Sequence, residues 1–153
     1  MTPHIEKRLL QTVVSIACVV PLLAGTMGIV LGAAWYKGVE TPPVDLNSHF
    51  RYLSGLLLAI GISFLRCVPD IEIKTERFRL LCFLVIVGGL ARLVSMVIEG
   101  LPSQGQIFGL GMELIVVPLL MLWQGRLDRR FQIIVHPPRE TPHPLLGKKK
   151  VSP

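Results

Sequence analysis

The chain has 153 residues, of which 51% are apolar and only 17% charged, and its mean hydropathy is +0.58. A soluble domain usually carries about a quarter charged residues, because a small globule has much surface to hydrate. The composition therefore excludes a disordered chain, a secreted disulfide scaffold and an ordinary soluble enzyme. It indicates an integral membrane protein, and the net charge of +6 favours anionic lipid headgroups as partners.

Four apolar stretches can cross a membrane as helices, each of which needs about 20 mostly apolar residues. The predicted spans are residues 9–36, 50–66, 78–98 and 106–124. Proline and glycine mark the connections between them as turns. The sequence thus predicts an all-α, four-transmembrane-helix bundle with short loops over residues 1–125. Residues 126–153 are basic and proline-rich, and we expect them to form a mobile cytoplasmic tail.

The first stretch has a second interpretation as a signal peptide, because Lys7 and Arg8 precede it and Gly32-Ala33-Ala34 resembles a cleavage site. A signal core is only about 7–15 apolar residues long, so we expect this longer stretch to be retained. The loop charges then predict the orientation. With the N-terminus in the cytoplasm, 13 of the 16 Lys and Arg residues lie inside, Lys37 and Arg51 lie outside, and Arg92 lies within the membrane. Such a bias predicts that both termini are cytoplasmic.

Two ionisable residues, Arg92 and Glu113, lie within the last two spans. Charges at this depth are costly and normally take partners. Arg92 precedes Glu99, where the third span ends, by seven residues, and Glu113 follows Gln106, where the fourth begins, by seven. At 1.5 Å per residue both lie about 10 Å below the same membrane boundary. We therefore predict an Arg92–Glu113 ion pair.

Further polar residues on three spans point to the same outer half of the bilayer. The cluster has two interpretations: a buried pair that sets helix register, with Arg51 reaching the interface, or a water-accessible pocket for a lipid-like anion. The first is favoured by the balance of acid and base, and the second by the additional arginine and a nearby histidine. The candidate pocket residues are Arg51, Arg92, Glu113, Ser54, Ser95 and His49.

Small or ring-constrained side chains form a strip on the first span, at Ala17, Pro21, Gly25, Gly28 and Gly32. Small residues four apart let membrane helices approach closely. The strip can pack within the bundle or dock on another membrane subunit, and the sequence leaves both possibilities open.

Known catalytic motifs are missing from the sequence: it holds no phosphate loop, HExxH, nucleophile elbow or dinucleotide fingerprint. Cys18, Cys67 and Cys82 lack metal-binding spacing, and His49 stands alone. We therefore expect no catalytic residue, metal or cofactor. We also expect no nucleic-acid partner, since the basic residues flank apolar spans and form no base-stacking patch.

Three sequence segments resemble the bacterial "domain of unknown function 4345" family of small four-helix membrane proteins. They are Asn47 to Gly55, Gly88 to Ser95 with Gly100-Leu101-Pro102, and Glu113 with Pro118. The resemblance covers about residues 9–125. It implies a bacterial membrane location and four spans, but no agreed activity.

We expect a non-enzymatic accessory, assembly or interaction subunit of a larger complex in the bacterial inner membrane. This expectation rests on the small-residue strip, the absence of catalytic machinery and the small extramembrane mass. The alternative is a carrier or enzyme for a lipid-like anionic ligand. In that case Arg51 captures the headgroup, Arg92 holds the anion and Glu113 exchanges a proton.

Overall fold

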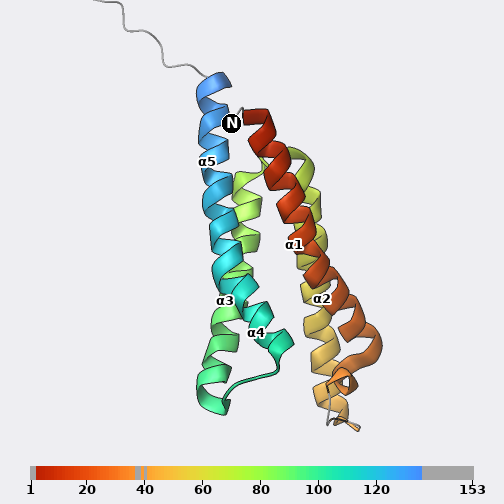
Figure 1. The fold of residues 1–153 in the computed structure, drawn as a ribbon. Helices are drawn as coiled ribbons and strands as arrows, with labels where there is room; N and C mark the ends of the chain where they lie inside the picture. The colour runs from red at the N-terminus through yellow and green to blue at the C-terminus, as the bar shows by residue number, and fades with distance from the viewer. Residues whose placement is uncertain (1–2, 37–38, 40, 136–153) are drawn as a thin grey trace, which may run out of the picture.

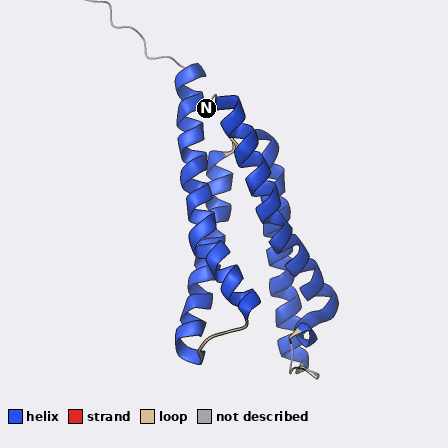
Figure 2. Ribbon diagram, viewed as in Figure 1, coloured by secondary structure: helices blue, strands red, loops and turns tan. Residues whose placement is uncertain are grey.

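A computed structural model describes residues 3–36, 39 and 41–135, and all regular structure in these residues is helical (Figures 1 and 2). Four helical stretches are long and apolar enough to cross a membrane. The elements in order are α1 (Pro3–Leu31), η1 (Gly32–Trp35), α2 (Val44–Cys67), η2 (Val68–Asp70), α3 (Thr75–Glu99), α4 (Gln104–Gly111), the π-helical η3 (Met112–Val116) and α5 (Val117–Val135). The last three elements form one continuous helical stretch, the fourth that is long enough to cross a membrane.

Several helices extend beyond the predicted spans. Helix α1 begins at Pro3, α2 begins at Val44, and α5 continues to Val135. The first ten residues of the predicted tail are therefore helical, because polar residues can extend a helix beyond the apolar run that marks a span. The rest of the tail lies outside the described residues.

Helices α1 and α2 pack closely along glycines. A Cβ atom added to Gly25 would lie 2.8 Å from the backbone nitrogen of Leu58, and one added to Gly28 would lie 2.8 Å from the Cβ atom of Ser54. Only a residue without a side chain allows this approach. The strip on α1 thus packs within the molecule, which is one of the two possibilities that the sequence left open.

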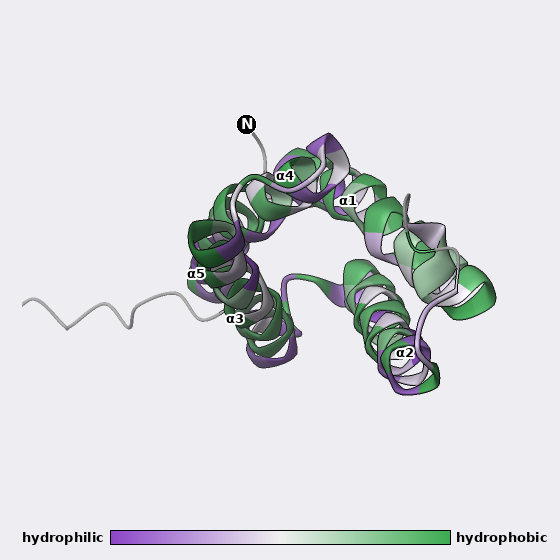
Figure 3. Cartoon of the chain, turned by 90° about the horizontal axis from the view of Figure 1, so that it is seen from below, coloured by the Kyte–Doolittle hydropathy of each residue, from purple (hydrophilic) through white to green (hydrophobic). Residues whose placement is uncertain are grey.

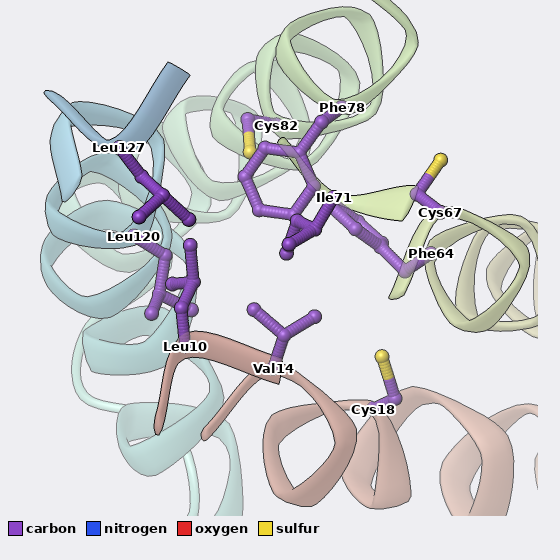
Figure 4. Packing of buried hydrophobic residues seen from close by; sticks show 10 residues of the cluster. All are labelled: Leu10, Val14, Cys18, Phe64, Cys67, Ile71, Phe78, Cys82, Leu120 and Leu127. Atoms are coloured by element: carbon purple, nitrogen blue, oxygen red, sulfur yellow. The ribbon is translucent and has the colours of Figure 1, made fainter. Parts of the chain in front are cut away.

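The buried apolar core lies at the end of the bundle where α1 begins and α5 ends (Figures 1 and 4). Phe64 and Phe78 meet edge to face there, with ring centroids 5.4 Å apart. The core residues come from all four crossings and the turn between α2 and α3: Leu10, Val14, Cys18, Phe64, Cys67, Ile71, Phe78, Cys82, Leu120 and Leu127. Residues far apart in the sequence therefore join at this end.

Polar side chains reinforce this packed end. The fully buried Gln124 donates from Nε2 to the carbonyl oxygen of Ile71 (2.8 Å) and to Oγ1 of Thr75 (2.7 Å). Glu6 accepts hydrogen bonds from Nε1 of Trp123 (3.2 Å) and Nη1 of Arg130 (2.7 Å). These bonds tie α5 to α1 and to the turn between α2 and α3.

At the opposite end the helices separate into two pairs, α1 with α2 and α3 with the final crossing (Figure 1). Seen along the bundle, they follow an arc with α2 and α3 at its two ends (Figure 3). Large apolar side chains point outward, such as Leu23, Leu80 and Leu119, each about 60% exposed. Helices that are apolar on their outer faces are typical of a protein whose solvent is lipid.

Candidate functional site

Arg92 of α3 and Glu113 of η3 lie side by side, with Nη2 of Arg92 3.2 Å from Oε1 of Glu113. Glycines bring their helices together: a Cβ atom added to Gly109 would lie 2.9 Å from Nη1 of Arg92, and one added to Gly89 would lie 2.9 Å from the Cβ atom of Glu113. The other carboxylate oxygen of Glu113, Oε2, is buried without a hydrogen-bond partner. The Arg92 side chain is 35% exposed and that of Glu113 18%.

Glu113 lies in the π-helical segment η3, which ends just before Pro118. Proline has no backbone N–H and its ring clashes with the carbonyl group four residues earlier, here that of Leu114. A wider π turn relieves such a clash, and π segments are frequent at functional sites. Pro118 thus accounts for the local unwinding at Glu113.

A chain of hydrogen bonds continues from Arg92 to the other helix pair. Nη1 of Arg92 donates to Oε1 of Gln106 (2.5 Å), and the Gln106 amide donates to the hydroxyl oxygen of Tyr36. The Tyr36 ring meets Phe50 of α2 edge to face. Tyr36 therefore connects the Arg92 site to α2. Sequence reasoning missed this role of Tyr36, because its contact with Gln106 spans 70 residues.

A hollow of about 330 Å³ opens beside these residues. Its polar lining comes from Tyr36, Arg92, Ser95, Glu99 and Gln106, and its apolar lining includes Met96, Leu101 and Pro102. The predicted pocket residues Arg92 and Ser95 lie here. Glu113 is not part of this lining, but it contacts Arg92, which is.

The family model for a domain of unknown function (DUF4345) matches residues 9–124, more than half of the chain. The chain belongs to this family. The resemblance to this family is thereby confirmed. The match includes the Arg92 site and all or most of each of the four membrane-length helices. Comparison with curated proteins and with solved structures finds no match.

The predicted pocket residues on α2 have other partners in this DUF4345 chain. Nη1 of Arg51 donates to the carbonyl oxygens of Ile29 and Val30, at the end of α1. Asn47, one turn earlier, accepts a hydrogen bond from the backbone nitrogen of Ala33 (3.0 Å). The α2 side chains thus cap α1, at the point where Gly32 takes a positive φ of 66°.

Ser54 and His49 also have partners other than Arg92. Ser54 is buried beside Gly28 and donates to the carbonyl oxygen of Phe50 in its own helix (2.8 Å). His49 is exposed and lies against Tyr52. Within the described residues, no hydrogen bond or ion pair joins Arg51, Ser54 or His49 to Arg92 or Glu113. The six predicted pocket residues therefore form two groups.

The three cysteines are free and buried in the core, as expected of small apolar side chains. Among the described residues, no three His, Cys, Asp or Glu side chains are placed to hold a metal ion. Around Arg92, the guanidinium can donate hydrogen bonds to an anion, and the carboxylates of Glu99 and Glu113 can pair with a cation. This arrangement, which we call the Arg92 group, is suited to binding a charged ligand.

Proposed function

We propose that this protein is a non-enzymatic accessory, assembly or interaction subunit of a larger complex in the bacterial inner membrane. Both termini face the cytoplasm in this proposal, and the basic residues near them contact anionic lipid headgroups. The family match and the four membrane-length helices support a small multi-pass membrane protein. These two findings do not by themselves indicate an accessory role. That role requires an outward-facing surface on which another subunit can dock.

A small-residue strip on α2 is the observation that carries the proposal. Gly55, Ala59 and Ser63 follow one another at intervals of four, so they share one face of the helix. A Cβ atom added to Gly55 would meet no atom within 4 Å, and Ala59 is exposed. The Ser63 hydroxyl donates to the carbonyl oxygen of Ala59, so it needs no external partner. The strip on α1 is covered by α2, whereas this one is open to a helix of another subunit.

The test is purification from native membranes in mild detergent, followed by mass measurement of the intact particle. We expect a particle larger than the 16.9 kDa chain that holds a second membrane protein in fixed stoichiometry. Ala59→Leu fills the strip and should release that protein. Ala91→Leu on α3 is the matched control, because Ala91 is also exposed, and it should retain the second protein. A strictly monomeric wild-type particle, or equal behaviour of the two variants, contradicts the proposal.

A second candidate function is the carriage or conversion of a lipid-like anionic ligand. The observation in its favour is the hollow lined by Arg92, which has a polar and an apolar side. Arg51 does not belong to the site in this version, because its guanidinium caps α1.

A further inference from the structure

The hollow beside Arg92 carries charges of both signs at different depths. Arg92 lines it deeper in the crossing, and Glu99 lines it at the end of α3. We propose that this hollow binds the headgroup of a zwitterionic phospholipid with a primary amine, with its phosphate at Arg92 and its ammonium group at Glu99. The inference is independent of the accessory role, but it deepens the second candidate function because it needs a ligand in the same hollow.

Arg92 has hydrogen-bonding capacity left for a phosphate. A guanidinium group carries five N–H donors in a planar fork that suits phosphate. Arg92 contacts Gln106 through Nη1 and Glu113 through Nη2, which leaves further N–H donors free, and its side chain is partly exposed. The hydroxyl groups of Ser95 and Tyr36 line the same hollow and can donate as well. The deep part of the hollow is therefore a phosphate site.

Glu99 supplies the matching negative charge at the rim. Its side chain is exposed and makes no ion pair with any described residue. It follows Arg92 by seven residues, so its backbone lies about 10 Å further along the helix axis, at the end of α3. The Arg92 side chain spans part of this distance, because its guanidinium contacts Gln106 near the start of α4. In an amine-bearing phospholipid the phosphate lies next to the glycerol and the ammonium group lies further out. The order of charges along α3 matches that of the headgroup.

The charge balance favours a zwitterion over an anion. Glu113 already compensates part of the Arg92 charge at 3.2 Å, and Glu99 would repel a headgroup that carries only negative charge. A primary ammonium group can donate hydrogen bonds to the Glu99 carboxylate, whereas a quaternary one cannot. We therefore expect preference for a primary amine over choline and over glycerol.

The size of the hollow suits a headgroup and not a whole lipid. Its volume of about 330 Å³ is at the small end of ligand sites. Met96 and Leu101 provide apolar lining, and Leu101 is 84% exposed at the edge. The acyl chains would continue along the outward apolar faces of the helices, as ordinary membrane lipid does.

The experiment is native mass spectrometry of the full chain in detergent, titrated with phosphatidylethanolamine, phosphatidylcholine, phosphatidylglycerol or the chain-free glycerophosphoethanolamine. We expect phosphatidylethanolamine to be retained best and glycerophosphoethanolamine to compete poorly. Glu99→Gln should lower the preference for phosphatidylethanolamine over phosphatidylcholine by roughly two- to fivefold, as expected of an exposed ion pair. Glu76→Gln, at the exposed start of the same helix, should leave the preference unchanged.

Arg92→Lys should weaken retention of both zwitterionic lipids, since lysine keeps the charge but loses the planar fork. If this variant does not fold, the exposed Glu99 position still decides the question. Equal retention of all lipids, or an unchanged preference in Glu99→Gln, overturns the inference. Preference for phosphatidylglycerol overturns it while supporting the anionic ligand of the second candidate function. Equally strong competition by glycerophosphoethanolamine rejects a lipid as the ligand. If none of the four compounds is retained, both this inference and the second candidate function are rejected.

Discussion

At the scale of single residues, the Arg92–Glu113 contact makes a testable contribution to stability. Glu113→Gln keeps the shape of the side chain but removes its charge, which leaves the guanidinium without its carboxylate. A fully buried pair costs about 3–5 kcal/mol to break; because Arg92 is 35% exposed, we expect about 1–3 kcal/mol. The melting temperature should fall by roughly 2–12 °C, the range that corresponds to this loss in a chain of this length.

The buried cysteines provide the readout for this measurement. Their thiols are inaccessible in the folded chain, so reaction with a fluorescent maleimide on heating reports unfolding. The double variant Arg92→Leu/Glu113→Leu should recover part of the loss, because it leaves no unpaired charge. Glu76→Gln is the control and should melt like the wild type. A Glu113→Gln variant that also melts like the wild type would show that the contact adds nothing to stability.

Residue spacing predicts the depth of a side chain in a helix, but it does not predict which distant group that side chain contacts. Arg92 and Glu113 could be placed level by counting residues from a short turn. Arg51 could not be assigned in this way, because its partners are carbonyl oxygens at the end of α1. Every helix ends in unpaired carbonyl groups, but nothing in a sequence shows which distant arginine will reach them.

At the scale of helices, a glycine in the α1–α2 contact and an open glycine on α3 should respond in opposite ways to substitution by alanine. Gly28→Ala would place a methyl group against Ser54, and we expect overpacking to cost about 1–3 kcal/mol. Gly88→Ala on α3 meets no atom within 4 Å and removes backbone freedom, so it should stabilise the helix by about 0.5–1 kcal/mol. Thermal unfolding of both variants checks the pair. Equal shifts of the two melting temperatures would contradict the close approach of α1 and α2 at Gly28.

The apolar stretches of the sequence predict where the helices lie, but they do not predict how each helix adjusts to a proline. Pro118 lies in the last membrane-length helix, where the structure shows a π segment that ends at Val116. The same residue type at position 21 leaves α1 continuous from Pro3 to Leu31. Local sequence indicates where a backbone hydrogen bond is lost, whereas neighbouring packing decides how the helix adjusts.

At the scale of the whole molecule, the proposed orientation can be tested with two cysteine variants. Thr41→Cys and Ile73→Cys place thiols at exposed positions on opposite ends of the bundle. With both termini in the cytoplasm, a membrane-impermeant maleimide added to intact cells should label the Thr41→Cys variant only. The buried native cysteines should give little background. Labelling of the Ile73→Cys variant instead would reverse the orientation.

Composition and the length of apolar runs determined by themselves that the chain forms helices long and apolar enough to cross a membrane, since a bilayer admits few backbone arrangements. The height of Arg92 and Glu113 likewise followed from a constant rise per residue. Only the tertiary structure decided that the α1 strip packs on α2, that the core gathers at one end, and that Tyr36 rather than Arg51 joins the Arg92 group. These features depend on contacts between distant residues, whose pairing is set by the packing of whole helices and leaves no local pattern in the sequence.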